Sequence, residues 1–481
     1  MKSTLLTRVY EHIETTSKTL SFWSASAAFV IISLLIFPTF MLMGEVASAI
    51  IIAGILALSV YILSPKVWLY SVLLSSYFFY TKTITEESSA LILFAMAYHA
   101  SLFAWIFSHV ILKRKKLITH WIDLMFMIFL GFLTINGLIA LANDVELLFW
   151  LKTWQLHLII LYYLPLREIC ADRKSQTILL GVCTVVLIIQ GVSAIYLYKT
   201  ALSNFKFASQ LLYVGVRNGA SVFTVASLAS LLAVLFTSKK IPKILLLVFH
   251  FFCFTVLLIS LARAAWVGYA VGVLLMILLL RKTLRIQLLI GILLVSFSVG
   301  SIGFIFFNSK ATLILNIINT RFTSSAQFAT DPSYLSRIYE NESLRKGIEE
   351  YPLGGGGLQT THNRYDAISR TTTIGSYAHN NYLGSAEKMG IPLAALFFGI
   401  LLSIVIRNWR IAWTSHDRRR LFFAISSSVG LVGIGVINFV GSVFDQREGM
   451  FLLAIIFAFS AFAYNLDERP TKLPPKNLPL E

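Results

Sequence analysis

Charged residues are scarce in this sequence, and hydrophobic residues are abundant. Only 13% of the 481 residues are charged, whereas 57% are hydrophobic. Soluble domains carry about 25% charged residues, so this composition excludes a soluble globular protein and indicates a polytopic membrane protein. At about 20 residues per membrane-spanning helix, the chain is long enough for roughly a dozen or more spans.

Cysteine is also scarce, and the patterns that bind metal ions are missing. The three cysteines, Cys170, Cys183 and Cys253, lie in or beside apolar stretches without a CxxC spacing. They therefore predict neither a disulfide framework nor a metal knuckle. The sequence has no HExxH motif, no DxD pair and no His–carboxylate cluster in its longest polar stretch, and Glu387 and Asp445 are isolated acids. We predict no metal ion and no cofactor.

Acidic residues are few compared with basic ones. The chain holds 40 Lys and Arg against 23 Asp and Glu, a net charge of +17. Such an excess can indicate nucleic-acid binding, but nearly all of it lies in short turns between apolar stretches, as the positive-inside rule expects. The charge therefore predicts topology, with both termini in the cytoplasm and no nucleic-acid partner. The basic turns are residues 113–116, 173–174, 239–240, 281–282 and 418–420.

The apolar stretches predict an all-α bundle of about 14 membrane-spanning helices, within a range of roughly 12 to 14. No repeat of fixed period and no inverted pair of broken helices is visible, which argues against a secondary transporter. The chain divides into N-terminal transmembrane helices (1–307), a large extracytoplasmic loop (308–388), C-terminal transmembrane helices (389–466) and a cytoplasmic tail (467–481). The stretches lie near 21–43, 46–64, 67–81, 88–112, 121–142, 147–166, 176–198, 219–238, 243–261, 265–280, 286–307, 389–406, 421–443 and 449–465.

The loop 308–388 is the only long segment too polar to lie in a bilayer. Apolar residues recur at roughly helical spacing over 334–351, which predicts one amphipathic helix along the membrane or capping the bundle. Pro352 ends that helix, and four glycines follow at 354–357. These glycines either leave room for a ligand or form a flexible turn. They are not a nucleotide P-loop, because no strand precedes them and no Lys-Ser/Thr follows.

Two arginines stand beside apolar stretches, where charge is costly. Arg263 lies between two stretches that almost no loop separates, with no acid nearby in the sequence. It either snorkels to the outer headgroups or binds phosphate oxygens through paired hydrogen bonds, for which its alanine neighbours leave space. Arg217 opens another stretch, where a cation opposes the helix dipole and gains more from an anionic ligand at the free amides. Arg217 can equally be an interfacial anchor.

His379 lies where the polar loop meets the next apolar stretch. Imidazole titrates near neutral pH, so His379 is either a general base for a hydroxyl or an ordinary packing and hydrogen-bonding residue. His362 also precedes an asparagine, but it lies further from the membrane, so we rank it below His379. Arg337, near the start of the predicted loop helix, is either a substrate contact or a solvated surface charge.

Three motifs, in this order and spacing, resemble the bacterial O-antigen ligase and polymerase family. Residues 259–266, Ile-Ser-Leu-Ala-Arg-Ala-Ala-Trp, resemble the family's Ser-Arg-small-small-aromatic turn, with Ala262 in place of the usual Ser. Arg337 followed by residues 350–356, Glu-Tyr-Pro-Leu-Gly-Gly-Gly, resembles the loop helix and Pro-Leu-Gly-x-Gly of the family. Residues 378–392, from Ala-His-Asn-Asn-Tyr-Leu to Glu-Lys-Met-Gly-Ile-Pro, resemble its His-Asn-x-Tyr-Leu and Glu-x-Gly-Ile block. The likeness covers roughly residues 210–465.

This resemblance implies a glycosyltransferase-C type enzyme of the bacterial inner membrane. Such an enzyme moves a glycan from undecaprenyl diphosphate to an acceptor hydroxyl at the extracytoplasmic face, inverting the anomeric centre without a metal. By the same likeness, Arg217 and Arg263 hold the diphosphate, and His379 is the catalytic residue that positions or deprotonates the acceptor. Further candidates for substrate binding are Arg337, Asn380 and Tyr382.

The resemblance leaves two reactions open. A polymerase would extend a polysaccharide repeat unit, and we favour it slightly because it needs one kind of substrate. A ligase would transfer the finished glycan to lipid A-core or another acceptor. The implied partners are the undecaprenyl-diphosphate-linked donor, a glycan or lipid-linked acceptor, the lipid bilayer, and assembly proteins such as a flippase or a chain-length regulator. A transporter of lipid-linked sugars, with charges paired along a central pathway, is a third alternative.

Overall fold

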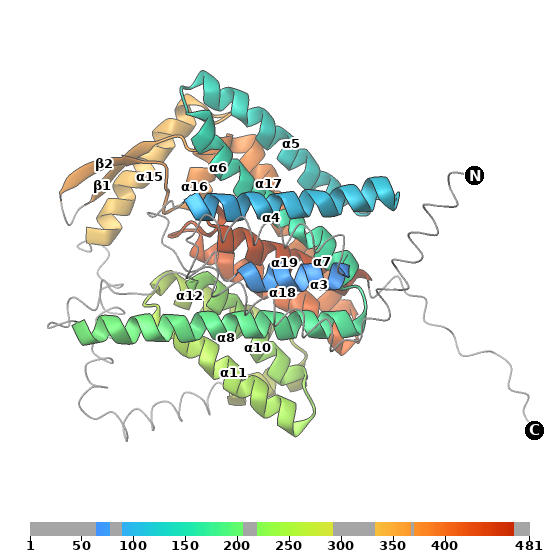
Figure 1. The fold of residues 1–481 in the computed structure, drawn as a ribbon. Coiled ribbons are helices and arrows are strands. Elements are labelled where there is room, and N and C mark those ends of the chain that lie inside the picture. The colour runs from blue at the N-terminus through green and yellow to red at the C-terminus, as the bar shows by residue number, and fades with distance from the viewer. Residues whose placement is uncertain (1–63, 77–88, 205–218, 292–331, 367–369, 466–481) are drawn as a thin grey trace, which may run out of the picture. The chain divides into compact units, whose positions relative to one another are not determined.

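The computed structural model describes residues 64–76, 89–204, 219–291, 332–366 and 370–465. The chain forms two compact units, one of residues 1–119 with 164–186 and one of residues 120–163 with 187–481. Figure 1 shows the elements of both units, and almost all of them are helices. The predicted helical class is therefore confirmed for the described part of the chain.

The first unit is helical, and ion pairs connect some of its elements at their polar ends. Its elements are α3 (Pro65–Ser75), α4 (Ser89–Phe107), the π-helical turn η2 (Ser108–Leu112) and parts of α7 (Tyr163–Ile169) and α8 (Arg173–Asn204). Glu168 binds both His109, at 2.8 Å, and Lys115, at 2.7 Å. These contacts connect the end of the π-helical turn to the short helix before the basic turn at 173–174.

The second unit contains the loop and most of the bundle. Its elements are α5 (Trp121–Ala142), α6 (Leu147–Leu158), η3 (Ile159–Tyr162), α10 (Ala220–Phe236), α11 (Lys240–Ile259), α12 (Arg263–Leu279), α15 (Pro332–Glu350), β1 (His362–Asp366), β2 (Thr371–Gly375), α16 (Asn381–Met389), α17 (Ile391–Thr414), α18 (Arg418–Ile437), η4 (Val443–Asp445) and α19 (Arg447–Asn465).

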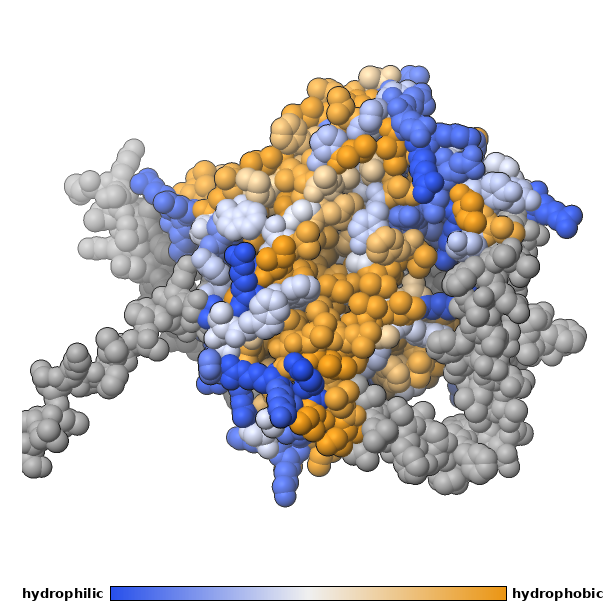
Figure 2. All heavy atoms as spheres, turned by 180° about the vertical axis from the view of Figure 1, so that it is seen from behind, coloured by the Kyte–Doolittle hydropathy of each residue, from blue (hydrophilic) through white to orange (hydrophobic). Residues whose placement is uncertain are grey.

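Many of these helices have the length and surface of membrane spans. Among the described residues, seven helices are long and apolar enough to cross a membrane, and three more apolar helices are shorter. Large apolar side chains such as Leu138, Leu278 and Trp413 are 66–69% exposed, and Figure 2 shows broad hydrophobic areas on one face. Such surface suits contact with lipid. The count of about 14 spans stays a prediction, because the stretches at 21–43, 46–64 and 286–307 and both termini lie wholly or mainly outside the described residues.

Helix α18 is the centre of the second unit, and it packs against α10, α12, α17 and α19. Close approach depends on small residues: a Cβ added to Gly268 of α12 would lie 2.7 Å from the carbonyl oxygen of Gly433 on α18. Thr224 of α10 donates a hydrogen bond to the carbonyl of Ala265, at 3.3 Å. The first turns of α10 and α12 therefore lie together near the C-terminal end of α18, which we call the loop end of the bundle.

The predicted loop helix is confirmed as α15, but its apolar residues do not form one stripe. Ile338 and Tyr339 are exposed, whereas Leu344 and Glu340 are buried. The face that packs against β1 and α16 thus carries a carboxylate as well as a leucine. The all-α prediction also missed the antiparallel hairpin β1–β2, in which His362 is opposite Gly375 (Figure 1). Three threonines favour the extended conformation of β2.

The glycines at 354–357 form a close-packed joint, so neither an open ligand cradle nor a flexible turn describes them. Gly355 and Gly357 have φ angles of 70° and 102°, a region that favours glycine. The amides of Gly356 and Gly357 donate to the carbonyls of Glu387, at 2.8 Å, and Lys388, at 3.0 Å. A Cβ on Gly355 would lie 2.5 Å from the backbone of Lys388. The joint fixes the loop to the end of α16.

Asn136 of α5 secures this joint from the bundle side. Its amide group donates to the carbonyls of Gly354, at 2.9 Å, and Lys388, at 3.1 Å. Its oxygen accepts from the amide of Leu358, at 3.1 Å, and from the indole of Trp150, at 3.3 Å. An asparagine side chain has two donor hydrogens and two acceptor lone pairs, and all four are used here.

We expect Asn136→Ala to destabilise the joint strongly, because the carbonyl of Gly354, the amide of Leu358 and the indole of Trp150 lose their partner, at about 1–3 kcal/mol for each buried group. The measurement is thermal unfolding in detergent together with limited proteolysis of the 352–358 segment. Asn143→Ala is the control, because Asn143 donates a single hydrogen bond to Gly356 in the same joint. Equal melting temperatures for the two variants would show that Asn136 is not the fastening point.

Candidate functional site

His379 lies two residues before α16, and the residue between them caps that helix. Asn380 is the N-cap, and its side-chain oxygen accepts from the amides of Tyr382, at 3.2 Å, and Leu383, at 3.3 Å. Asparagine is one of the preferred N-cap residues because its short side chain satisfies amides that have no helical partner. The His-Asn sequence therefore places an imidazole at a fixed helix start.

The start of α16 is attached to the end of α18. The amide of Asn381 donates to the carbonyl of Asn438 at 2.9 Å. The hydroxyl of Tyr382 donates to the carbonyl of Gly435 at 2.8 Å, and its ring packs against Phe439 with the ring centres 4.6 Å apart. These contacts hold His379 at the loop end of the bundle.

Arg263 is the first residue of α12, and its helix starts at the same end. The backbone changes direction at Leu261, which has a φ of 53°. Gly268, little more than one turn after Arg263, lies against Gly433 and Ile437 of α18. Arg263 itself is half-buried. The structure therefore brings the beginnings of α12 and α16 to the same end of α18.

Of the other two predicted arginines, the structure describes Arg337 but not Arg217. Arg217 lies outside the described residues. Gly219, two positions later, has a left-handed backbone conformation and is the N-cap of α10. Arg337 lies on α15, one turn before Glu340, and is half-buried. Its helix packs against α16, the helix that follows His379.

The closest partner of His379 is a residue that the sequence did not single out. The Nδ1 atom of His379 lies 2.8 Å from Oε2 of Glu340, and the His379 amide donates to Oε1 at 3.4 Å. The Nε atom of Arg364 lies 3.3 Å from the same carboxylate. The Glu340 side chain is 3% exposed, whereas 32% of the His379 side chain remains exposed.

Glu340 is ionised despite its burial. Burial raises its pKa, but hydrogen bonds from His362 and His379 and the charges of His379 and Arg364 outweigh this effect and lower the pKa to about 2. The carboxylate therefore faces His379 as an anion at neutral pH. An anion at Nδ1 favours the tautomer with the proton on Nδ1, which leaves Nε2 as the basic nitrogen.

His362 joins Glu340 to a second buried carboxylate. Its Nε2 atom lies 3.5 Å from Glu340, and its Nδ1 atom lies 3.2 Å from Glu387. Burial lowers the pKa of His362, but its bonds to Glu340 and Glu387 raise the pKa above the ordinary value. Among the described residues, no group of three or more His, Cys, Asp or Glu is arranged as metal ligands.

Three sequence interpretations need correction here. Glu387 is not isolated, because it pairs with His362. Asp445 is not isolated either, because it forms a 2.8 Å ion pair with the buried Lys388. The loop does contain a His–carboxylate cluster. Its members lie at positions 340, 362, 379 and 387, which are 22, 17 and 8 residues apart in the sequence. No local motif therefore marks them.

One sequence signal could have found Glu340. Glu340, Leu344 and Gly347 are spaced by four and three residues, so they share one face of α15. A Cβ on Gly347 would lie 2.8 Å from the Glu387 carboxylate. A carboxylate on a face with a leucine and a helical glycine predicts a close-packed partner rather than a solvated charge.

A hollow lies on the neighbouring face of α15 and the hairpin. Its volume is about 540 Å³. Tyr339 and Tyr365 meet edge to face there, with ring centres 5.1 Å apart. The polar residues that line it are Glu342, Ser343, Lys346, Asn363 and Thr372. Aromatic rings beside amides, hydroxyls and charges can bind a polar ligand with apolar faces.

A family model matches the part of the chain that contains most of this site. Residues 246–398 match the model described as O-antigen ligase, and no curated protein matches the chain. The matched segment includes Arg263, Arg337, Glu340 and His379, whereas Arg217 precedes it. Residues 246–398 therefore resemble an O-antigen ligase domain, and this match supports a membrane protein of the O-antigen ligase and polymerase family.

Proposed function

We propose that the protein is a membrane glycosyltransferase that polymerises surface-polysaccharide repeat units. The donor is a glycan on undecaprenyl diphosphate, and the reaction inverts the anomeric centre without a metal ion. The observation that carries this proposal is the 2.8 Å contact of His379 with an ionised, buried Glu340 at the loop end. A base so held can accept a proton while its second ring nitrogen faces a substrate.

The reaction needs a leaving group, a nucleophile and a base. The acceptor hydroxyl loses its proton to Nε2 of His379, and its oxygen forms a bond to the anomeric carbon. The bond from that carbon to the diphosphate oxygen breaks on the opposite side, and its electron pair stays on the diphosphate. Arg263 and Arg217 stabilise that charge, as guanidinium groups do for phosphate oxygens.

Glu340 positions His379 for this step. It holds Nδ1 in the protonated state and stabilises the imidazolium that forms when the acceptor proton arrives. His362 and Arg364 keep Glu340 ionised and in place. Tyr377 packs against His379 on another side, because the two rings meet edge to face with their centres 5.2 Å apart.

The hollow beside Tyr339 and Tyr365 is a place for the glycan. A polymerase binds sugar as both donor and acceptor, and the hollow offers an aromatic surface with amide and hydroxyl groups. The description of the matching family model as a ligase supports the second candidate, transfer of a finished glycan to lipid A-core or another acceptor. In both cases the site lies on the extracytoplasmic face of the inner membrane, with both termini in the cytoplasm. A flippase and a chain-length regulator are fitting assembly partners.

Purified protein incubated with an undecaprenyl-diphosphate oligosaccharide tests this function. We expect a ladder of longer lipid-linked glycans, whereas a ligase would give one addition and only when its lipid acceptor is present. We expect His379→Gln to lower turnover by about 10²–10⁴-fold. The matched control is His109→Gln, since His109 also binds a glutamate at 2.8 Å, in the other unit. Full activity of the His379 variant would refute the assigned role.

We expect Arg263→Lys to lower kcat/KM roughly 10- to 100-fold. The guanidinium can give two charge-assisted hydrogen bonds to a phosphate group, and the lysine ammonium loses one of them. The readout is transfer rate at varied donor concentration. Arg410→Lys is the control, since Arg410 is an exposed cation near the other end of α17. If the two variants have the same kcat/KM, Arg263 does not bind the diphosphate.

The pH dependence of the loop's stability tests the charge arrangement. His362 has a raised pKa, so its stabilisation is complete below about 6.5 and decreases as pH rises through its folded-state pKa. Glu340 has a lowered pKa, so its stabilisation is complete above about 4.5 and is lost only as pH falls towards about 2. We therefore expect amide exchange in α15, corrected for intrinsic rates, to be slower at pH 5.5 than at pH 8.5.

We expect Glu340→Gln to speed that exchange and to weaken its dependence on pH, while turnover falls roughly 10- to 100-fold with the loss of one charge-assisted hydrogen bond. Glu349→Gln is the matched control, because Glu349 is an exposed carboxylate on the same helix and does not line the hollow. An unchanged pH dependence in the Glu340 variant would contradict the role of this carboxylate in holding the loop.

A further inference from the structure

A cavity of about 460 Å³ lies at the end of the bundle opposite His379. It is bordered by the end of α10, the start of α11, the residues after α12 and the turn from α17 to α18. Helix α18 has 20 residues and is therefore about 30 Å long. The cavity and the His379 site are at opposite ends of that helix, so they are separate sites.

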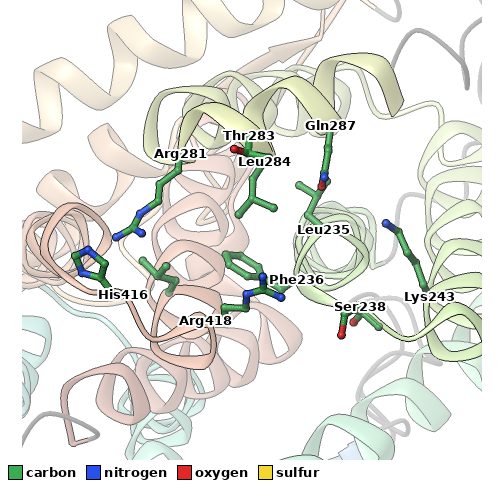
Figure 3. Close-up of a pocket in the computed structure, with 12 residues that line it drawn as sticks. Leu235, Phe236, Ser238, Lys243, Arg281, Thr283, Leu284, Gln287, His416 and Arg418 are labelled. Atoms are coloured by element: carbon green, nitrogen blue, oxygen red, sulfur yellow. The ribbon is translucent and has the colours of Figure 1, made fainter.

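Four basic or titratable side chains from three separate segments line the cavity: Lys243, Arg281, His416 and Arg418. Figure 3 shows Arg281 and His416 on one side, Lys243 on the other, and Arg418 between them. No acid is among the described residues that line it. The carboxylate of the neighbouring Asp417 accepts the amides of Arg419 and Arg420 as the cap of α18, at 2.7 and 2.9 Å.

The position of Arg281 is fixed by the fold. Its guanidinium donates to the carbonyl of Ser415 at 3.0 Å, which connects the segment after α12 to the α17–α18 turn. Like charges that gather without an acid repel one another, and the repulsion grows where apolar walls exclude water. An anion in the cavity would remove that cost.

The wall of the cavity is apolar. Leu421 belongs to the buried cluster at this end of the bundle, and Leu235, Phe236 and Leu284 pack against that cluster. The hydroxyls of Ser238 and Thr283 lie at the cavity among the cations. A free inorganic anion would gain nothing from such a wall, whereas a molecule that joins a phosphate to hydrocarbon would contact both parts.

We propose that this cavity binds the phosphate headgroup of an anionic phospholipid from the adjoining leaflet. Basic pockets between transmembrane helices on the cytoplasmic side are suited to such headgroups, and the positive-inside rule assigns this end to the cytoplasm. Arg281 and Arg418 bind the phosphate oxygens, Lys243 adds charge across the cavity, and the acyl chains lie along Leu235 and Phe236. The lipid fastens three helix turns that otherwise repel each other.

Thermal unfolding of the detergent-purified full chain tests the proposal, with lipid titrated into the sample. We expect phosphatidylglycerol to raise the melting temperature in a saturable manner, and phosphatidylcholine or inorganic phosphate at equal concentration to have little effect. The double variant Lys243→Gln with Arg418→Gln should bind phosphatidylglycerol roughly 30-fold more weakly. Lys282→Gln is the control, since Lys282 neighbours Arg281 but does not line the cavity.

Each other outcome overturns the proposal in a recognisable way. Equal stabilisation by inorganic phosphate would mean a free-anion site, and equal stabilisation by phosphatidylcholine would mean an unspecific detergent effect. An equal loss in the Lys282 variant would mean that only net charge matters. Native mass spectrometry of the double variant, counting bound phosphatidylglycerol, decides the case if that variant unfolds too early for melting curves. None of these readouts depends on glycan transfer.

Discussion

An ionised carboxylate can be buried only where cations and donors surround it, and Glu340 is such a carboxylate. His379, His362 and Arg364 all lie within 3.5 Å of its oxygens. Glu340 comes from the loop helix, His362 and Arg364 from the hairpin, and His379 from the start of α16. The Glu340 carboxylate therefore connects the loop helix, the hairpin and the segment before α16. His379 is held by this contact while part of its side chain stays exposed.

Two joints attach the loop to the bundle. Asn136 uses its whole hydrogen-bonding capacity on the glycine segment, on α6 and on the end of α16. Asn381 and Tyr382 fasten the start of α16 to the end of α18. With small residues such as Gly268 bringing α12 against the same helix, Arg263 and His379 are carried to one end.

Basic side chains thus lie near both ends of α18, but their surroundings differ. At the loop end, His379 contacts a buried carboxylate, and Arg263 begins a helix at the same end. At the other end, cations gather around an apolar wall, where the described lining residues include no acid. The first arrangement suits a reaction at a diphosphate, and the second suits stable retention of a phosphate headgroup.

Hydrophobic runs, basic turns and the loop helix could be predicted from the sequence, because each depends on neighbours within a few residues. His379 and Arg263 could be singled out for the same reason, since His379 stands where a polar segment meets an apolar one and Arg263 stands between two apolar stretches. The partners could not: Glu340, His362, Glu387 and His379 meet only when helix, hairpin and bundle pack together. The pairing of Lys388 with Asp445 and the gathering of three basic turns around one cavity also required the tertiary structure. Electrostatic contacts act through space, and a sequence records only the order of residues along the chain.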